Sequence, residues 1–163
     1  MVEPDIKSLV ASFADVLPKF PDGRINYRDA KTAPVLSAVV RRQQEILLLK
    51  RSDQVRYYQG RWNVVAGYID AMTTLQDKVL AELHEELGVT NELIHVVDYG
   101  MPRTVIDKEV GVQWIIFPVL VELLVKPVLQ LNEEHTEYRW VLPEEVKNFS
   151  TVPLLGDTLA AFL

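Results

Sequence analysis

The sequence contains no cysteine among its 163 residues. Disulfide bonds, thiolate zinc sites and cysteine nucleophiles are therefore excluded. The lack of cysteine fits a reducing compartment. Near the start there is also no basic segment followed by an apolar run, the pattern of a secretory signal, so we expect a cytoplasmic protein. A long hydrophobic run is also missing. The most apolar stretch, residues 114–125, contains Pro118 and Glu122 and is shorter than the roughly 20 residues of a membrane-spanning helix, so we interpret it as a buried strand and expect no membrane partner.

The chain also lacks an excess of basic residues. Lysine and arginine number 17 against 23 aspartates and glutamates, which gives a net charge of −6. A broad basic surface for nucleic acid is disfavoured, and we expect no nucleic-acid partner. A phosphate-bearing substrate would meet an acidic protein, and a bound divalent cation would resolve that repulsion.

The remaining composition is that of an ordinary globular protein, with 48% hydrophobic and 25% charged residues. Its length suits one domain with a sizeable core. Apolar residues between Ile6 and Leu17 recur at helical spacing, and Pro18, Pro21 and Gly23 then break the pattern, which predicts a helix near the N-terminus.

Strands and helices alternate irregularly along the rest of the chain, which favours a mixed sheet packed between helices. The clearest helix covers residues 74–87, with capping-box spacing from Thr73 to Gln76 before it and Gly88 placed to end it. The polar residues 41–44 predict a hairpin turn between two strands. The expected strands are 34–40, 45–50, 62–65, 94–99, 112–125 and 137–142, and further helices are expected from residue 143 and over 157–163.

Three glutamates stand out on the helix over residues 74–87. Glu82, Glu85 and Glu86 are spaced i, i+3 and i+4, so their side chains share one arc of the helix and repel one another. Lys78 lies four residues before Glu82 and can relieve only that carboxylate. Hard cations such as Mg²⁺ prefer oxygen ligands. A glutamate-rich helix face is more often simply solvated, so the neighbouring sequence has to decide.

The neighbouring sequence places Gly67 fifteen residues before Glu82, and Gly88 and Val89 directly after the glutamate-bearing helix. This spacing resembles the Nudix box, G-x5-E-x7-R-E-U-x-E-E-x-G-U, where U is a bulky aliphatic residue. Segments flanking the box agree as well, at residues 47–51, 60–62 and 137–145. The resemblance implies an α/β/α sandwich around a mixed β-sheet, with residues 31–163 as the Nudix hydrolase domain and residues 1–30 as an extra N-terminal helical extension. The matching positions are Gly67, Glu82, Leu83, Glu85, Glu86, Gly88 and Val89.

The resemblance also implies roles for individual residues. Mg²⁺, or Mn²⁺ in its place, would be held by Glu82, Glu85, Glu86 and the carbonyl of Gly67. Besides Glu82 and Glu85, the expected catalytic residues include a general base in the loop after the main sheet. Glu134 and Glu137 are the candidates there, and Glu82 is an alternative base.

Other residues are expected to contact the substrate or to modulate the site. Arg51, Arg61 and Arg103 are candidates for phosphate binding, because the guanidinium group suits bidentate recognition. Tyr68 could stack on a base. His135 lies beside the candidate bases in the sequence and could tune them.

Two positions depart from the box. Thr73 stands where the family has glutamate, and Ala81 where it has arginine, a pair that commonly braces the loop against the helix. Because both are absent together, neither leaves an unpaired charge. We expect a Thr73 cap and apolar packing at Ala81 to take over the bracing.

The favoured function is therefore metal-dependent hydrolysis of a diphosphate bond in a nucleoside diphosphate linked to another moiety, by attack of water at phosphorus. One alternative is a non-catalytic Nudix-fold module that binds a nucleotide-like ligand or a protein partner. An isomerase of the isopentenyl diphosphate type is disfavoured, because that class relies on a cysteine. By analogy with relatives, a homodimer is expected.

Overall fold

One mixed β-sheet of eight strands organises the computed structural model, which describes residues 1–163. The sheet runs β3-β2-β1-β7-β5, while β4 pairs with β1, β6 with β7 and β8 with β2. Among these strand pairs only β1 and β7 are parallel. The strands are β1 (Thr32–Arg42), β2 (Glu45–Arg51), β3 (Trp62–Asn63), β4 (Val65–Tyr68), β5 (Ile94–Tyr99), β6 (Arg103–Asp107), β7 (Val112–Leu123) and β8 (His135–Val141).

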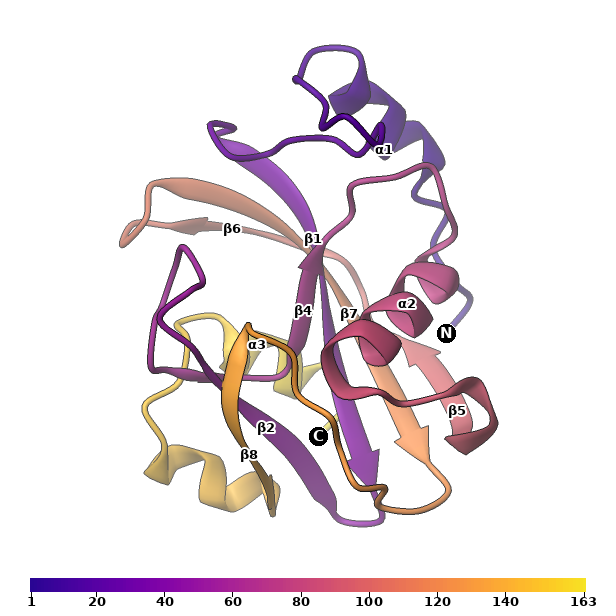
Figure 1. Ribbon diagram of the computed structural model, residues 1–163, viewed down its shortest axis with the longest axis vertical. Coiled ribbons are helices and arrows are strands. Elements are labelled where there is room, and N and C mark those ends of the chain that lie inside the picture. The colour runs from indigo at the N-terminus through magenta and orange to yellow at the C-terminus, as the bar shows by residue number, and fades with distance from the viewer.

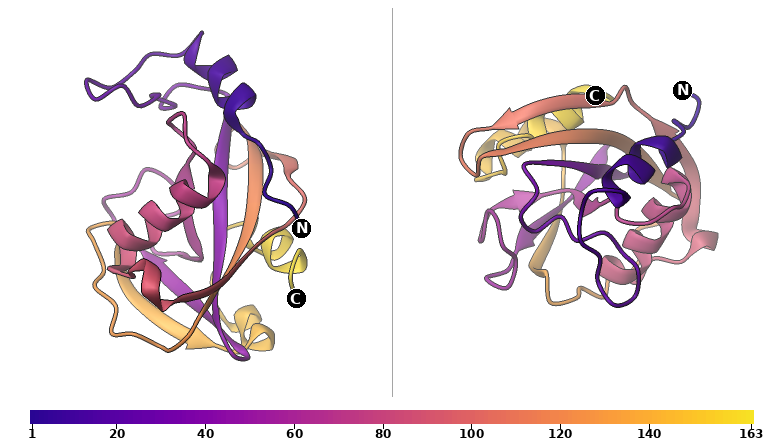
Figure 2. Two further views of the ribbon diagram at one scale, coloured as in Figure 1. Left: turned by 90° about the vertical axis from the view of Figure 1, so that its right-hand side faces the viewer. Right: turned by 90° about the horizontal axis from the view of Figure 1, so that it is seen from above.

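Helices cover both faces of this sheet, which confirms the predicted sandwich. Figure 1 and the left view of Figure 2 show α2 on one side of the sheet and α3 on the other, with α1 at one end. None of the helices combines the length and the apolar character needed to cross a bilayer. The helices are α1 (Lys7–Ala14), α2 (Leu75–Leu87), α3 (Leu155–Ala160) and the short 3₁₀ helices η1 (Asn91–Leu93) and η2 (Pro143–Asn148).

Strand β2 shows why the core has two parts. Successive side chains of a strand point to opposite faces. Leu47 and Leu49 therefore join the larger core beneath α2, while Ile46 and Leu48 join the smaller core that includes Leu155 of α3. All four leucine and isoleucine side chains are buried. The uninterrupted apolar run of β2 is thus the pattern of a strand covered on both faces.

The N-terminal segment packs against the rest of the domain. Ile6, Val10, Ile25 and Tyr27 are buried in the larger core together with residues of α2 and the sheet. The Tyr27 hydroxyl donates to the carbonyl of Ile69 at 2.7 Å. The segment therefore contacts the chain just ahead of α2, and the division of the protein near residue 30 stays a prediction.

The predicted hairpin between β1 and β2 is confirmed, and several element bounds differ from prediction. Strand β6 was not predicted, because three of its five side chains are exposed and its sequence has no clear alternation of apolar and polar residues. The first helix ends at Ala14 rather than near Leu17. The last helix begins at Leu155, two residues before the predicted start, and ends at Ala160.

Candidate active site

Helix α2 is fixed at both ends by hydrogen bonds. The Thr74 side chain, not that of Thr73, caps the first turn by accepting from the backbone N–H of Asp77 at 3.1 Å. The predicted Thr73 cap is therefore wrong by one residue, because Thr74 is the residue with the extended backbone that precedes the first helical turn. Gly88 ends the helix with φ of 69°, as expected for a left-handed cap.

A second cap comes from far away in the sequence. The Glu3 carboxylate accepts a hydrogen bond from the backbone N–H of Gln76 at 2.9 Å. A carboxylate at this position also complements the positive end of the helix dipole. The N-terminal segment thus helps to place the helix that carries the three glutamates.

The three glutamates of α2 have different surroundings. Glu82 is 8% exposed and Glu86 1% exposed, whereas Glu85 lies on the exposed side of the helix. Two carboxylates are therefore turned into the protein, where charge is costly unless it is compensated. A merely solvated helix face does not bury its acids in this way.

Gly67 and Glu82 approach each other very closely. A Cβ atom placed on Gly67 would lie 2.8 Å from Cδ and 2.9 Å from Oε1 of Glu82. Gly67 is part of β4 and does not have a left-handed backbone, so the position needs glycine for space rather than for a turn. The backbone of β4 therefore borders the Glu82 carboxylate directly.

Lys78 compensates part of the buried negative charge. Its Nζ atom lies 2.9 Å from Oε1 of Glu82 and 3.1 Å from Oδ1 of Asp70. Burial alone would lower the pKa of Lys78, but the two carboxylates outweigh it and raise the pKa above its usual value. As the sequence spacing predicted, Lys78 makes no ion pair with Glu85 or Glu86.

Glu86 has no comparable cation at hydrogen-bonding distance. Burial raises its pKa well above the usual range, and the nearby charges of Glu82 and Glu134 raise it further. His135 is buried with Nδ1 4.0 Å from Oε1 of Glu86, and burial and the charge of Arg51 lower its pKa to about 4. The imidazole is therefore neutral at pH 7 and does not form a true ion pair with Glu86.

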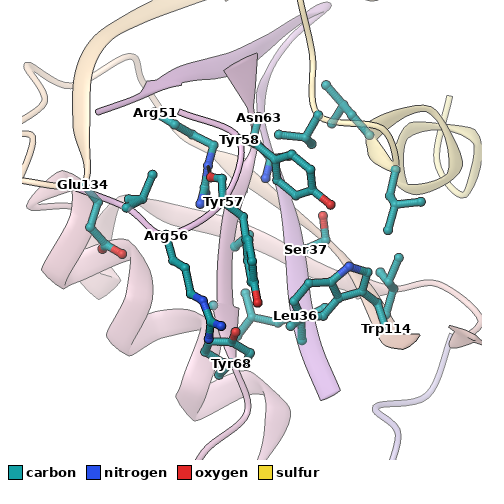
Figure 3. Close-up of a pocket in the computed structure, with 18 of the residues that line it drawn as sticks. Leu36, Ser37, Arg51, Arg56, Tyr57, Tyr58, Asn63, Tyr68, Trp114 and Glu134 are labelled. Atoms are coloured by element: carbon teal, nitrogen blue, oxygen red, sulfur yellow. Dashed lines mark hydrogen bonds between the residues drawn. The ribbon is translucent and has the colours of Figure 1, made fainter. Parts of the chain in front are cut away.

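A cavity of about 540 Å³ adjoins these carboxylates. Gly67 and Glu134 belong to its wall, which connects it to Glu82 and Glu86. The tyrosines Tyr57, Tyr58 and Tyr68 and the indole of Trp114 supply aromatic surface (Figure 3). The volume and mixed lining are typical of a small-molecule site.

Glu134 and Arg51 lie in this wall because two loops are tied together. Ser52 donates from its backbone N–H to the carbonyl of Glu134 at 2.8 Å and from its hydroxyl to the carbonyl of Glu133. Arg51 donates from Nε to the carbonyl of Tyr57 at 2.9 Å. The loop after β2 and the segment before β8 therefore form one side of the cavity, with Glu134 and Trp114 at opposite ends in Figure 3.

The structure does not bring three other predicted residues to the cavity. Arg61 pairs with Glu109, Arg103 with Asp157, and Glu137 with its neighbour Arg139 on β8. Their charges are used in surface ion pairs, and none of them lines the cavity. Distant partners of this kind leave no signal in the local sequence.

Some cavity residues were not singled out from the sequence. Arg56 lines the cavity, and its guanidinium group stacks on Tyr57 with 4.9 Å to the ring centroid. The hydroxyl of Thr158 donates to that of Ser37 at 3.1 Å, and both residues are buried in the wall. Arg56 directly precedes Tyr57 and Tyr58 in the sequence, and this neighbourhood is the signal that could have identified it.

The donor set fits a divalent cation, although no three acidic or histidine side chains converge into a complete ligand cluster. Oε2 of Glu86 is buried without a hydrogen-bond partner, and burial also raises the pKa of Glu82. Glu86 has no cation at hydrogen-bonding distance and Glu82 has only Lys78, so a bound cation would offset the remaining negative charge. Mg²⁺ usually takes only one or two carboxylates from a protein and completes its shell with water and phosphate oxygens.

The sequence model of the NUDIX domain family matches residues 31–162. The chain belongs to the Nudix family. As a MutT-like Nudix protein it is a pyrophosphohydrolase, a class that acts on nucleotide derivatives and generally uses divalent metal ions. The recognition of the family from the box and its flanks is thereby confirmed.

Individual relatives are distant. Nucleoside triphosphatase NudI of Klebsiella pneumoniae (strain 342) is 21% identical over 120 residues, covering 71% of this chain and 85% of NudI. The MutT protein of Methanosarcina mazei Go1 has a TM-score of 0.64 at 24% identity, covering 81% of this chain and 93% of that protein. The NUDIX domain of Shewanella oneidensis NrtR, solved with ADP ribose, has a TM-score of 0.67 at 15% identity, covering 93% and 94%. At these identities the structural likeness bears on the fold alone.

Proposed function

We propose that this Nudix protein uses Mg²⁺, or Mn²⁺ in its place, to hydrolyse the diphosphate bond of a nucleoside diphosphate linked to another moiety. One observation carries the proposal. The buried carboxylates of Glu82 and Glu86 adjoin, through Gly67 and Glu134, a cavity large enough for a nucleoside. Acids turned inward next to an aromatic cavity suit a metal-bound diphosphate with a base beside it.

Glu82, Glu86 and the carbonyl of Gly67 are the proposed ligands of the cation. Glu85 stays a predicted ligand, and its exposed position suits a contact through water. When bound, the cation would neutralise phosphate oxygens and lower the pKa of a water molecule. The buried Oε2 of Glu86, which has no partner, supports this assignment most directly.

Glu134 is the proposed general base. Its carboxylate lies in the cavity wall, and the hydrogen bonds of Ser52 hold its backbone there. It would accept the proton of the water that attacks phosphorus. Glu137 fits this role less well, because Arg139 already pairs with its carboxylate at 2.7 Å.

Substrate recognition is assigned to other residues that line the same cavity. Arg51 and Arg56 supply positive charge for phosphate oxygens. Tyr68 and Trp114 offer ring surface for a base, and their ring centroids lie 6.1 Å apart. The ADP ribose bound to the NrtR domain and the nucleoside triphosphatase activity named for NudI support the choice of nucleotide derivatives as first candidates.

A screen of purified protein with Mg²⁺ tests the proposal. Sugar nucleotides, dinucleotides, ADP-ribose and nucleoside triphosphates are incubated with the enzyme, and released nucleotide and phosphate are quantified. We expect cleavage of at least one diphosphate-linked compound and none in EDTA. Absence of any cleavage with Mg²⁺ or Mn²⁺ would favour the non-catalytic binding module instead.

Glu86→Gln provides the matching variant. It removes the buried charge with almost no change of volume, so we expect a fall in kcat of about a hundredfold or more with the fold retained. Glu144→Gln is the control, because Glu144 is exposed and lies outside the cavity. Wild-type turnover by Glu86→Gln would contradict the proposal.

Two further expectations accompany this function. They are a cytoplasmic location and, by analogy with relatives, a homodimer. Sedimentation equilibrium on the purified chain measures the oligomeric state directly.

A further inference from the structure

Lys78 is the only lysine or arginine of helix α2, and it is placed between two acids. Its Nζ lies 3.1 Å from Oδ1 of Asp70 and 2.9 Å from Oε1 of Glu82. The side chain of Lys78 is 13% exposed, and those of Asp70 and Glu82 are 11% exposed. Ion pairs with so little solvent access are screened weakly, so loss of the Lys78 ammonium would leave Glu82 without a partner and Asp70 with a single, longer ion pair to Arg24.

The three residues connect different parts of the chain. Asp70 lies in the loop that leads from β4 into α2, while Lys78 and Glu82 are one helical turn apart on α2. Thr73 and Ala81 carry no charge, so neither can form an ion pair between this loop and the helix. Asp70 is otherwise paired only with Arg24, at 3.7 Å. The Lys78 ammonium is therefore the cation that joins the loop to the helix here.

The same ammonium restricts the Glu82 carboxylate. Lys78 contacts Oε1, and Gly67 borders the carboxylate closely from the β4 side. Oε2 makes no ion pair, so Lys78 does not occupy the oxygen that would coordinate a cation. Partners of this kind, one step removed from a metal, orient its ligands and commonly affect its affinity.

We propose that Lys78 is a positioning residue, which holds the Glu82 carboxylate between the loop of residues 69–74 and Gly67 and leaves Oε2 to coordinate the cation. This role rests on the proposed function, because it presumes that Glu82 is a metal ligand. In this chain Lys78 and Asp70 supply the link that Thr73 and Ala81 cannot. Each of these two residues stands three positions before the site that departs from the box.

The opposite reading gives an effect of opposite sign. If Lys78 only competed with the cation for Glu82, its removal would strengthen metal binding, because one positive charge near the site would be lost. If Lys78 positions Glu82, its removal weakens metal binding, because the carboxylate can then turn away. Metal affinity measured without substrate therefore separates the two readings.

The test compares Mn²⁺ binding to the wild type, Lys78→Met and Lys78→Arg, followed by electron paramagnetic resonance of free Mn²⁺. We expect Lys78→Met to bind Mn²⁺ about 10- to 100-fold more weakly, the range seen when partners of metal ligands are removed. Lys78→Arg keeps the cation and should stay near the wild type. Lys126→Met is the control, since Lys126 pairs with Glu45 on the surface.

A rescue variant sharpens the test. Adding Thr73→Glu and Ala81→Arg to Lys78→Met restores a loop-to-helix ion pair at the box positions, so we expect Mn²⁺ affinity to recover at least partly. Should Lys78→Met not fold by circular dichroism, Lys78→Gln replaces it, and we expect Lys78→Gln to bind Mn²⁺ more weakly than the wild type.

Each outcome decides something. Unchanged or tighter Mn²⁺ binding by Lys78→Met overturns the positioning role while leaving the hydrolase proposal intact. A wild-type protein that binds neither Mn²⁺ nor Mg²⁺ refutes the metal-dependent function, and this inference with it. The positioning role is supported if Lys78→Met binds Mn²⁺ more weakly, Lys78→Arg binds it like the wild type and the rescue variant recovers affinity.

Discussion

Gly67→Ala is the sharpest perturbation of the proposed site. The added methyl group would lie 2.8 Å from Cδ and 2.9 Å from Oε1 of Glu82, where ordinary carbon contacts begin near 3.4 Å. The backbone of Gly67 is not left-handed, so alanine brings no conformational strain of its own. The three atoms nearest to the added methyl group all belong to Glu82, so the substitution acts first on that side chain.

The size of the effect follows from that contact. The carboxylate has to move by about 0.6 Å (from 2.8 to 3.4 Å), while a functional site tolerates errors of about 0.5 Å. A misplacement of about 1 Å can cost about a hundredfold in rate, so we expect kcat to fall about 10- to 100-fold. Stability should suffer less, by about 1 kcal/mol at the low end of overpacking, because Glu82 is a flexible side chain.

The assay is Mg²⁺-dependent turnover of the best substrate from the screen, with the melting temperature measured in parallel. Gly156→Ala is the matched control, because no atom lies within 4 Å of the position its Cβ would take. Gly67→Ala with kcat and Mn²⁺ affinity within twofold of the wild type would falsify the claim that Glu82 must be held against β4.

Further predictions concern charge, substrate binding and the cap. Mg²⁺ at a hundred times its Kd should stabilise the wild type by about 2.7 kcal/mol, a shift of roughly 5–10 °C by differential scanning fluorimetry, and Glu86→Gln should lose most of that shift. Glu134→Gln should lower kcat at least tenfold with little change in KM, and an unaltered kcat would remove Glu134 as the base. Arg51→Lys should raise KM about tenfold, because a charge-assisted hydrogen bond to phosphate is lost, and unchanged steady-state kinetics would contradict this contact. Glu3→Ala should lower the melting temperature by about 1–4 °C through loss of the cap on Gln76, whereas an equal melting temperature would show that the cap contributes nothing.

The sequence was most informative where local periodicity decides structure. Helix α2, its Gly88 end and the turn between β1 and β2 depend on neighbours within a few residues, and all three were predicted. The burial of Glu82 and Glu86 but not Glu85 follows from the position of the helix on the sheet. The spacing along the helix predicted that the three glutamates share one arc, but it could not predict which of them are buried.

Contacts between residues that are distant in the sequence could not be predicted from the sequence. Arg61 and Arg103 were predicted to bind phosphate. In the structure Arg61 pairs with Glu109 in the turn after β6, and Arg103 pairs with Asp157 of α3. Lys78 was recognised as a neighbour of Glu82 by its i, i+4 spacing, whereas its contact with Asp70 depends on the path of the loop. A single sequence shows which charges exist, and the fold decides which of them meet.

The parallel pairing of β1 with β7 has a consequence for how the protein is made. Thr32 pairs with Gln113 and Arg41 with Glu122, so the centre of the sheet joins segments about 80 residues apart. Closing so long a loop costs conformational entropy before stabilising contacts form, and such topologies fold slowly. The cavity is also completed late in synthesis, because Glu134 and Thr158 belong to its wall. A ribosome-bound chain therefore exposes the apolar β1–β2 hairpin until β7 and β8 have been synthesised, and slow, cool expression or chaperone assistance should raise the yield of folded enzyme.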